Sequence, residues 1–289
     1  MKNYKLLIIC PLVALLCISC GSDMAGDLPD VSQKGTTVIK ADIESILLEG
    51  DTRVWPEGAY VGVFGSESGI NEKYVLKRSD AGLSNAEFYG PEVSGETISA
   101  YFPWSDTFTG RAGAMPAQLS AAQDYADTTA LEIFRTYCPT AYSSMNGGRM
   151  KFFYPFGMLR VRIELFDCLK VQRISFTSSG APAAGKGVIL SDGTLKMEGG
   201  GVSSVVLDCG EGVDSIREDG GFSDFYLTLI PGNYTDAVLV IHAAGEDPIV
   251  CTLRSIAVPR IDASDYKLAS VTVSSGDPQG FIVNEQQFD

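Results

Sequence analysis

The chain has 289 residues, of which 45% are hydrophobic, and a formal net charge of −14. This length suits one large or two ordinary domains, and the apolar fraction is sufficient for a full core rather than a disordered chain. The acidic balance argues against nucleic acid or an anionic membrane face as a partner, and it fits an exported, soluble surface.

Residues 1–19 have the pattern of a secretory signal peptide. Lys2 and Lys5 form a short basic start, and a mostly apolar run follows over 6–18. This run is shorter than the roughly 20 residues that a membrane-spanning helix needs. Small residues at its end supply a cleavage site, so we expect the mature protein to be exported.

The end of this signal, Leu16-Cys17-Ile18-Ser19-Cys20, resembles the lipobox of bacterial lipoproteins, although Cys17 stands where Leu is usual. The resemblance implies that Cys20 is lipidated with diacylglycerol and fatty acyl chains such as palmitate. Acyl chains contribute about 0.8 kcal/mol per buried methylene, so the mature N-terminus would be held at the outer membrane. A plain secretion signal with an incidental Cys20 is the alternative.

A polar tether over 20–35 precedes the first predicted strand, Thr37 to Leu48. Alternation places its apolar and polar residues on opposite faces. One face carries Ile39, Ala41, Ile43 and Leu47, and the other carries Lys40, Asp42 and Glu44.

Short segments rich in β-branched and aromatic residues then follow one another between turn residues. They are 59–64, 73–77, 86–89, 97–102, 131–138 and 149–154. The segment 106–128 is expected to be a long irregular loop, functional or mobile, with one helical turn over 118–123.

Met158 to Leu165 is the clearest strand, because Leu159, Val161, Ile163 and Leu165 alternate with polar residues. Further strands are predicted at 170–177, 187–190, 194–197, 202–207, 224–230, 237–243, 249–254 and 266–273. The Ser191-Asp192-Gly193-Thr194 stretch predicts a hairpin between two of them.

Many short strands with hardly a helix predict an all-β chain of two tandem antiparallel β-sandwiches. We place the N-terminal sandwich at 36–166, the C-terminal sandwich at 167–276 and a short tail at 277–289.

The sequence offers little catalytic chemistry. It contains no nucleophile elbow, zinc-binding helix or phosphate-binding loop, so no catalytic residue, metal site or cofactor is predicted. His242 lies in an apolar strand, where a structural role is expected. Loop carboxylates fit no calcium-binding spacing; they are Glu211, Asp214, Glu218, Asp219, Asp262 and Asp265.

Two further groups of residues leave alternatives open. Trp55 and Trp104 are expected to plug the ends of a sandwich, or to form a platform on which sugars stack. Four cysteines of the mature chain could pair in three ways or remain buried thiols; they are Cys138, Cys168, Cys209 and Cys251.

Several stretches together resemble the fimbrillin-like proteins. Trp55 to Phe64 is similar to the family's Trp-x-x-Gly-Asp-x-Ile-Gly-Val segment, with Ala59 where Asp is frequent. Ile98 to Pro103 is similar to its Ala-Tyr-Tyr-Pro strand. Three more segments follow in the family's order: 116–123, 149–165 and 225–232, with Gly157 where His is frequent.

This resemblance implies two transthyretin-like sandwiches in a precursor of a pilus subunit, at the outer membrane or in the fimbrium. It also implies that an arginine-specific protease cuts after the first strand, which a neighbouring subunit then replaces. The expected cleavage bond joins Arg53 to Val54, and the exchangeable strand is the one carrying Ile39, Ala41, Ile43 and Leu47. Partners are other pilus subunits, with a host or bacterial surface receptor as a further candidate.

The only candidate donor strand in this chain is its C-terminus, from Tyr266 to Val273 and on to Phe281-Ile282-Val283. The last residues, including Asn284 and Gln287, are poor apolar fillers, so we expect a chain that accepts a strand more readily than it donates one. The alternatives are a surface lipoprotein that binds glycans without polymerising and, less favoured, a secreted hydrolase.

Overall fold

The structure, a computed structural model, describes residues 36–43, 54–126, 140–144, 148–190, 193–260, 268–275 and 281–287. Nearly all regular structure in these ranges is β-strand, and one short 3-10 turn, η1 (Arg78–Asp80), is the exception. No helix in this part of the chain has the length and apolar character needed to cross a membrane. The predicted all-β class is confirmed.

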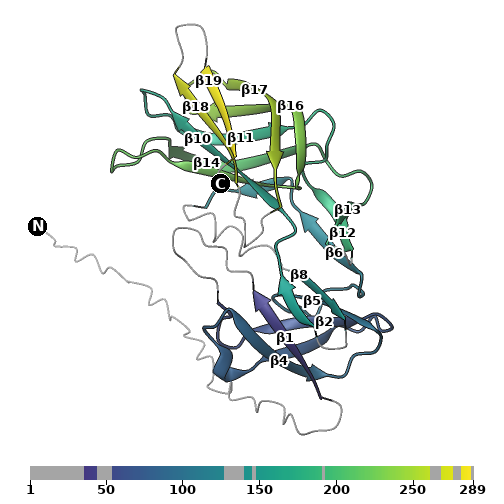
Figure 1. The fold of residues 1–289 in the computed structure, drawn as a ribbon. Coiled ribbons are helices and arrows are strands. Elements are labelled where there is room, and N and C mark those ends of the chain that lie inside the picture. Colours follow the sequence, from purple (N-terminus) through teal and green to yellow (C-terminus); the bar gives the residue numbers. More distant parts are fainter. Residues whose placement is uncertain are drawn as a thin grey trace, which may run out of the picture.

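The first half of the chain forms one seven-stranded sheet, the lower sheet of Figure 1. Its order is β8-β5-β2-β3-β4-β1-β9. The strands are β1 (Thr36–Ile43), β2 (Tyr60–Gly65), β3 (Glu72–Leu76), β4 (Asn85–Pro91), β5 (Thr97–Tyr101), β8 (Thr140–Ser144) and β9 (Arg149–Phe152). The two edge strands, β8 and β9, contact each other, so the sheet curls around its own core.

The second half forms two sheets that face each other across a separate core, at the top of Figure 1. The four-stranded sheet contains β15 (Asp224–Leu229), β10 (Gly157–Glu164), β18 (Ala269–Ser275) and β19 (Phe281–Gln287), in that order. The five-stranded sheet contains β17 (Ile249–Val258), β16 (Gly232–Ala243), β11 (Lys170–Thr177), β14 (Ser204–Asp214) and β7 (Ala122–Asp124).

A three-stranded sheet lies between these two parts in Figure 1. It is built from β13 (Leu195–Met197), β12 (Gly185–Leu190) and β6 (Ala114–Leu119). β12 and β13 form the predicted hairpin, and Gly193 has the positive φ, 80°, that its turn requires.

The segment predicted as an irregular loop with a helical turn instead contributes β6 and β7. β6 pairs with β12, and β7 pairs with β14, so both strands find their partners far along the chain. β6 is an edge strand, which tolerates Pro116. Gln123 on β7 also joins the two upper sheets: its Nε2 donates to Thr228 O at 2.8 Å, and Thr228 N donates to its Oε1 at 2.9 Å.

The sheets do not follow the predicted division at residue 166. β10 precedes that point, yet it hydrogen-bonds β15 and β18 and packs into the upper core. The predicted alternation along it is confirmed, with Leu159, Val161 and Ile163 buried. The stretch expected to be a short tail also contains a strand, β19, which pairs with β18.

Candidate functional site

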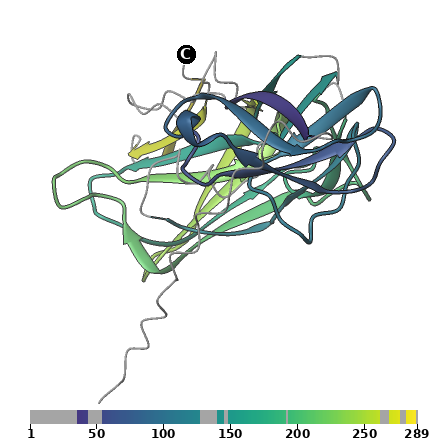
Figure 2. The same ribbon diagram turned by 90° about the horizontal axis from the view of Figure 1, so that it is seen from below.

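β1 occupies an interior position in the lower sheet. It runs antiparallel to β4, from Thr36 opposite Pro91 to Asp42 opposite Asn85, and parallel to β9. Both edges of the β1 backbone are therefore paired over its second half, since the β9 register begins at Lys40 opposite Arg149. In Figure 2 this sheet is seen from below, with β1 in purple against the blue strands. We call the position between β4 and β9 the β1 slot.

The apolar face of β1 is buried in the lower core. Ile39, Ala41 and Ile43 are 4%, 0% and 2% exposed. The predicted buried face is thus confirmed at these three positions, whereas Leu47 lies outside the described residues. On the opposite face Val38 is 44% exposed, as the alternation requires.

Each buried side chain of β1 has definite neighbours across the sheet. Ile39 lies opposite Phe88 of β4, and Ile43 lies beside Phe152 of β9. Ala41 in the middle adjoins two further residues, Ala86 of β4 and Met150 of β9. Large residues thus occupy both ends of the β1 slot, and small residues of β1 and β4 meet at its centre.

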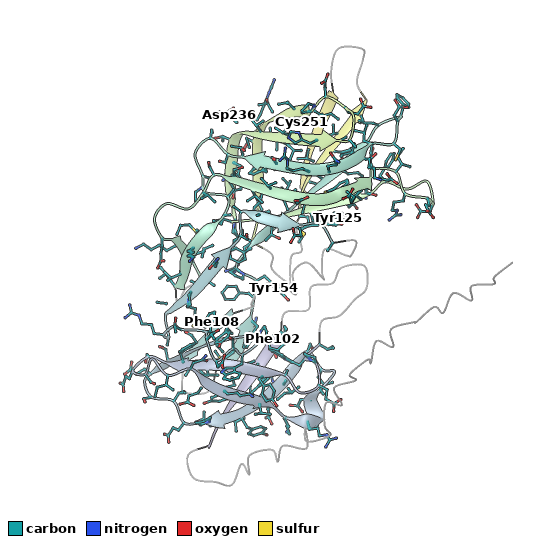
Figure 3. All side chains as sticks on the ribbon, turned by 180° about the vertical axis from the view of Figure 1, so that it is seen from behind. Phe102, Phe108, Tyr125, Tyr154, Asp236 and Cys251 are labelled. Carbon is teal, nitrogen blue, oxygen red and sulfur yellow. The ribbon has the colours of Figure 1, made fainter. Side chains whose placement is uncertain are left out.

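Trp55 fills the core beside the slot. Its side chain is fully buried and packs edge-on against Phe88, Phe102 and Phe152, with ring centroids 4.8, 5.3 and 5.2 Å away. Phe102, labelled in Figure 3, belongs to the segment after β5. Trp55 therefore anchors the turn at the end of β1 to the lower core.

The chain leaves and re-enters the lower sheet at one turn. Ile43 N donates to Ser84 O at 3.0 Å, and Trp55 N donates to the neighbouring Leu83 O at 2.9 Å. Residues 44–53, including Arg53, lie outside the described residues. Val54, the other side of the expected cleavage bond, is 39% exposed. A cut between Arg53 and Val54 would leave Trp55 covalently joined to the rest of the sheet and would break the covalent link between β1 and Trp55.

The solvent face of β1 makes one ionic contact to β9. Arg149 forms an ion pair with Asp42 of β1, and its Nη1 also donates to Asn85 Oδ1 of β4 at 2.8 Å. The guanidinium thus joins the three adjacent strands. Both charged side chains are partly solvated, so the pair contributes about 1 kcal/mol at most.

The C-terminal strands lie in the other part of the molecule. β18 is an interior strand, parallel to β10 and antiparallel to β19. β19 is the edge strand of its sheet. Of the predicted donor region, only β19 could therefore leave without opening the interior of the four-stranded sheet.

The tryptophans do not form a sugar platform. Trp55 is fully buried, and the half-buried Trp104 has the ammonium of Lys73 over its ring, 4.6 Å from the centroid. The same ammonium lies 3.7 Å from the centroid of Tyr60. These rings are occupied by a side chain of the protein itself.

The other sequence candidates remain separate surface or core groups. In the part of the chain that the structure describes, no three His, Cys, Asp or Glu residues are placed to hold a metal ion. Asp219 accepts a hydrogen bond from the Gly221 backbone N–H and pairs with Arg217 on the surface. These two contacts, the Gly221 N–H first, lower the pKa of Asp219. Asp262, Asp265, Cys20 and Cys138 lie outside the described residues.

The described cysteines are unpaired thiols. Cys168 is exposed, whereas Cys209 and Cys251 are buried. Burial raises the pKa of Cys209 to about 12 and also raises the pKa of Cys251. Neither buried thiol is activated as a nucleophile, because the thiolate is the reactive form.

Comparison with known proteins gives matches in structure alone. No protein-family model and no curated protein matches the chain. A candidate cell adhesion protein from Bacteroides ovatus matches 89% of this chain and 98% of its own, with a TM-score of 0.58 and 14% identity. Another from Bacteroides uniformis matches 88% and 98%, with a TM-score of 0.53 and 13% identity. The chain has the fold of these two proteins.

A more distant match is the tip fimbrial protein Mfa3 from Porphyromonas gingivalis with a C-terminal truncation. It covers 88% of this chain and 99% of that one, with a TM-score of 0.45 and 8% identity. At that TM-score it adds nothing to the fold assignment. The fold expected from the resemblance to fimbrillin-like proteins, an all-β chain built from several sheets, agrees with the first two matches.

Proposed function

We propose that the chain is a cell-surface subunit of a fimbrial or adhesive assembly, in which β1 is exchanged for a strand of another subunit. The observation that carries the proposal is the position of β1, which lies between two strands and is the first element of the described residues. The fold shared with candidate cell adhesion proteins supports it. No enzymatic step forms part of this function.

The energetics of β1 favour exchange over spontaneous loss. Burying a large aliphatic side chain contributes about 1.5–3 kcal/mol. Ile39 and Ile43, both buried, would together contribute roughly 3–6 kcal/mol. This is a large fraction of the 5–15 kcal/mol that typically stabilises a domain. An empty slot would also expose unpaired backbone groups of β4 and β9, which form a template for another strand.

Cleavage would make exchange accessible. While the chain is intact, β1 is tethered to Trp55 through residues 44–53, so it rebinds before a competitor can enter. A cut at Arg53 would remove that tether and leave the Trp55 anchor in place. We further propose that Cys20 carries the lipid that holds the precursor at the outer membrane until this cut.

The proposal is tested by digestion with an arginine-specific protease. Peptide mapping should find cleavage between Arg53 and Val54 before any other bond, and the matched variant Arg53→Lys, which keeps the charge, should resist. The cut protein should then form larger species with a co-expressed partner, as followed by size-exclusion chromatography. Resistance of the 53–54 bond while other bonds are cut, or a cut protein that never takes up a strand, would overturn the proposal.

A further inference from the structure

The β1 slot has a constriction at its centre. Trp55 contacts both Phe88 and Phe152, which lie beside Ile39 and Ile43 at the two ends of the slot. The indole therefore spans the middle of the slot, where the side chains of β1 and β4 are short. Ala41 and Ala86 lie opposite each other there, and both are buried.

A larger side chain at the Ala41 position would have to fit into a fully buried and closely packed environment. Trp55, Met150 and Ala41 are all fully buried, so an added branch would have to displace the indole or the sheet. Overpacking of this kind typically costs about 1–3 kcal/mol. The centre of the slot therefore selects a small residue.

The solvent-exposed face of the slot selects the charge of the side chain at the Asp42 position. Arg149 and Lys151 of β9 flank the Asp42 position: Arg149 binds the Asp42 carboxylate, and Lys151 lies beside Asp42 in register. A strand with a carboxylate at this position restores the ion pair when β1 leaves. A strand with a lysine there places three positive charges together.

We infer that the β1 slot accepts only strands that carry a five-residue pattern like that of Ile39 to Ile43. The first and fifth residues of this pattern are large and apolar, the third is small and the fourth is acidic. The second residue is unrestricted. This inference rests on the proposed exchange of β1. It adds the partner's chemistry: an extended segment of a different chain that carries this pattern and runs parallel to β9.

The chain's own C-terminal strands do not carry the pattern. β18, Ala269–Ser275, contains no acidic residue. In β19, aligning Glu285 with Asp42 places Asn284 in the centre of the slot and Gln286 in the second large pocket. Self-assembly through these strands is therefore disfavoured, and the occupant is a strand of another protein.

The test uses the full chain cut once between residues 43 and 54, at Arg53 or at a protease site introduced into 44–53. Labelled peptides with the sequence of residues 36–48 compete for the slot, and incorporation is measured by fluorescence anisotropy. We expect Ala41→Leu in the peptide to weaken incorporation about 5- to 150-fold. Asp42→Lys should weaken it by about two- to fivefold, whereas the control Val38→Lys, on the same solvent face, should change it less than about twofold.

A charge swap distinguishes the ion pair from a general effect of the peptide. Protein carrying Arg149→Glu should bind the Asp42→Lys peptide better than the parent peptide. Arg149→Gln, which is the milder change, should reduce the difference between the two peptides without reversing it, because Lys151 still lies beside position 42. A peptide of residues 277–289 should not enter the slot.

The outcomes separate the two proposals. If the parent peptide enters and the Ala41→Leu and Asp42→Lys peptides enter equally well, the selection rule is wrong while strand exchange stands. Entry of the 277–289 peptide would refute the exclusion of the chain's own tail. If the parent peptide itself never enters the cut protein, strand exchange fails, and the selection rule fails with it.

Discussion

Replacing Ile43 with Ala tests whether the contacts that hold β1 in the folded chain also control its release. Ile43 is 2% exposed and lies beside Phe152 in the lower core. An Ile→Ala change at a buried site costs about 2–5 kcal/mol, because the lost transfer free energy adds to that of the cavity left behind. The urea midpoint of the uncut chain should fall accordingly.

The same change should act on the cut chain as a change in affinity. Since 1.4 kcal/mol corresponds to a factor of ten, the loss of about 2–5 kcal/mol predicts a dissociation constant for the β1 fragment that is roughly 30- to 4,000-fold higher. The matched control is Val38→Thr, which keeps β-branching at an outward position and should shift stability by no more than about 0.5 kcal/mol. Fragment release is followed by mass spectrometry of the isolated body.

One result would refute this reasoning. If Ile43→Ala destabilises the uncut chain but leaves release of the fragment from the cut chain unchanged, the buried face of β1 does not limit exchange. Some other contact, outside the β1 slot, would then hold the fragment.

Three further predictions concern other parts of the chain. Gln123→Leu removes both partners of the buried Thr228 backbone and should lower the free energy of unfolding by about 1–3 kcal/mol. Gln118→Leu, at an exposed position of β6, should not lower it, and equal urea midpoints for the two variants would contradict this. Burial raises the pKa of Tyr74 to about 12, whereas an unfolded tyrosine has a pKa of roughly 10. Because the folded chain retains this proton where the unfolded chain loses it, the free energy of unfolding should fall as pH rises from about 10 to 12. The fall should be less steep in Tyr74→Phe. Cys20→Ala should release the protein from the membrane fraction, and a variant that stays membrane-bound would refute lipidation at Cys20.

The buried face of β1 could be predicted from the sequence because strand geometry alone determines it. Alternation placed Ile39, Ala41 and Ile43 on one side, and no knowledge of the partner strands was needed. The same local signal identified β10, and the Asp-Gly pair identified the turn between β12 and β13.

The rest of the site depends on pairings between distant segments, which local patterns do not encode. Arg149 reaches Asp42 across 107 residues of sequence, and only the parallel pairing of β1 with β9 brings them together. β6 and β7 were predicted as loop because their partners, β12 and β14, lie far along the chain. The turn residues beside Trp55 predict a position near a strand end, but they do not predict its ring partners Phe88 and Phe152, which lie on distant strands.

Hydrogen exchange on the body of the cut protein tests the central claim most directly. The amides of β4 and β9, Asn85–Pro91 and Arg149–Phe152, are to be followed before the cut, after removal of the β1 fragment, and after addition of the residue 36–48 peptide. The account predicts that amides facing the β1 slot lose protection when the fragment leaves and regain it when the peptide binds, while those of β16 and β17 stay unchanged. Protection in β4 and β9 that is the same with the slot filled and empty would contradict it.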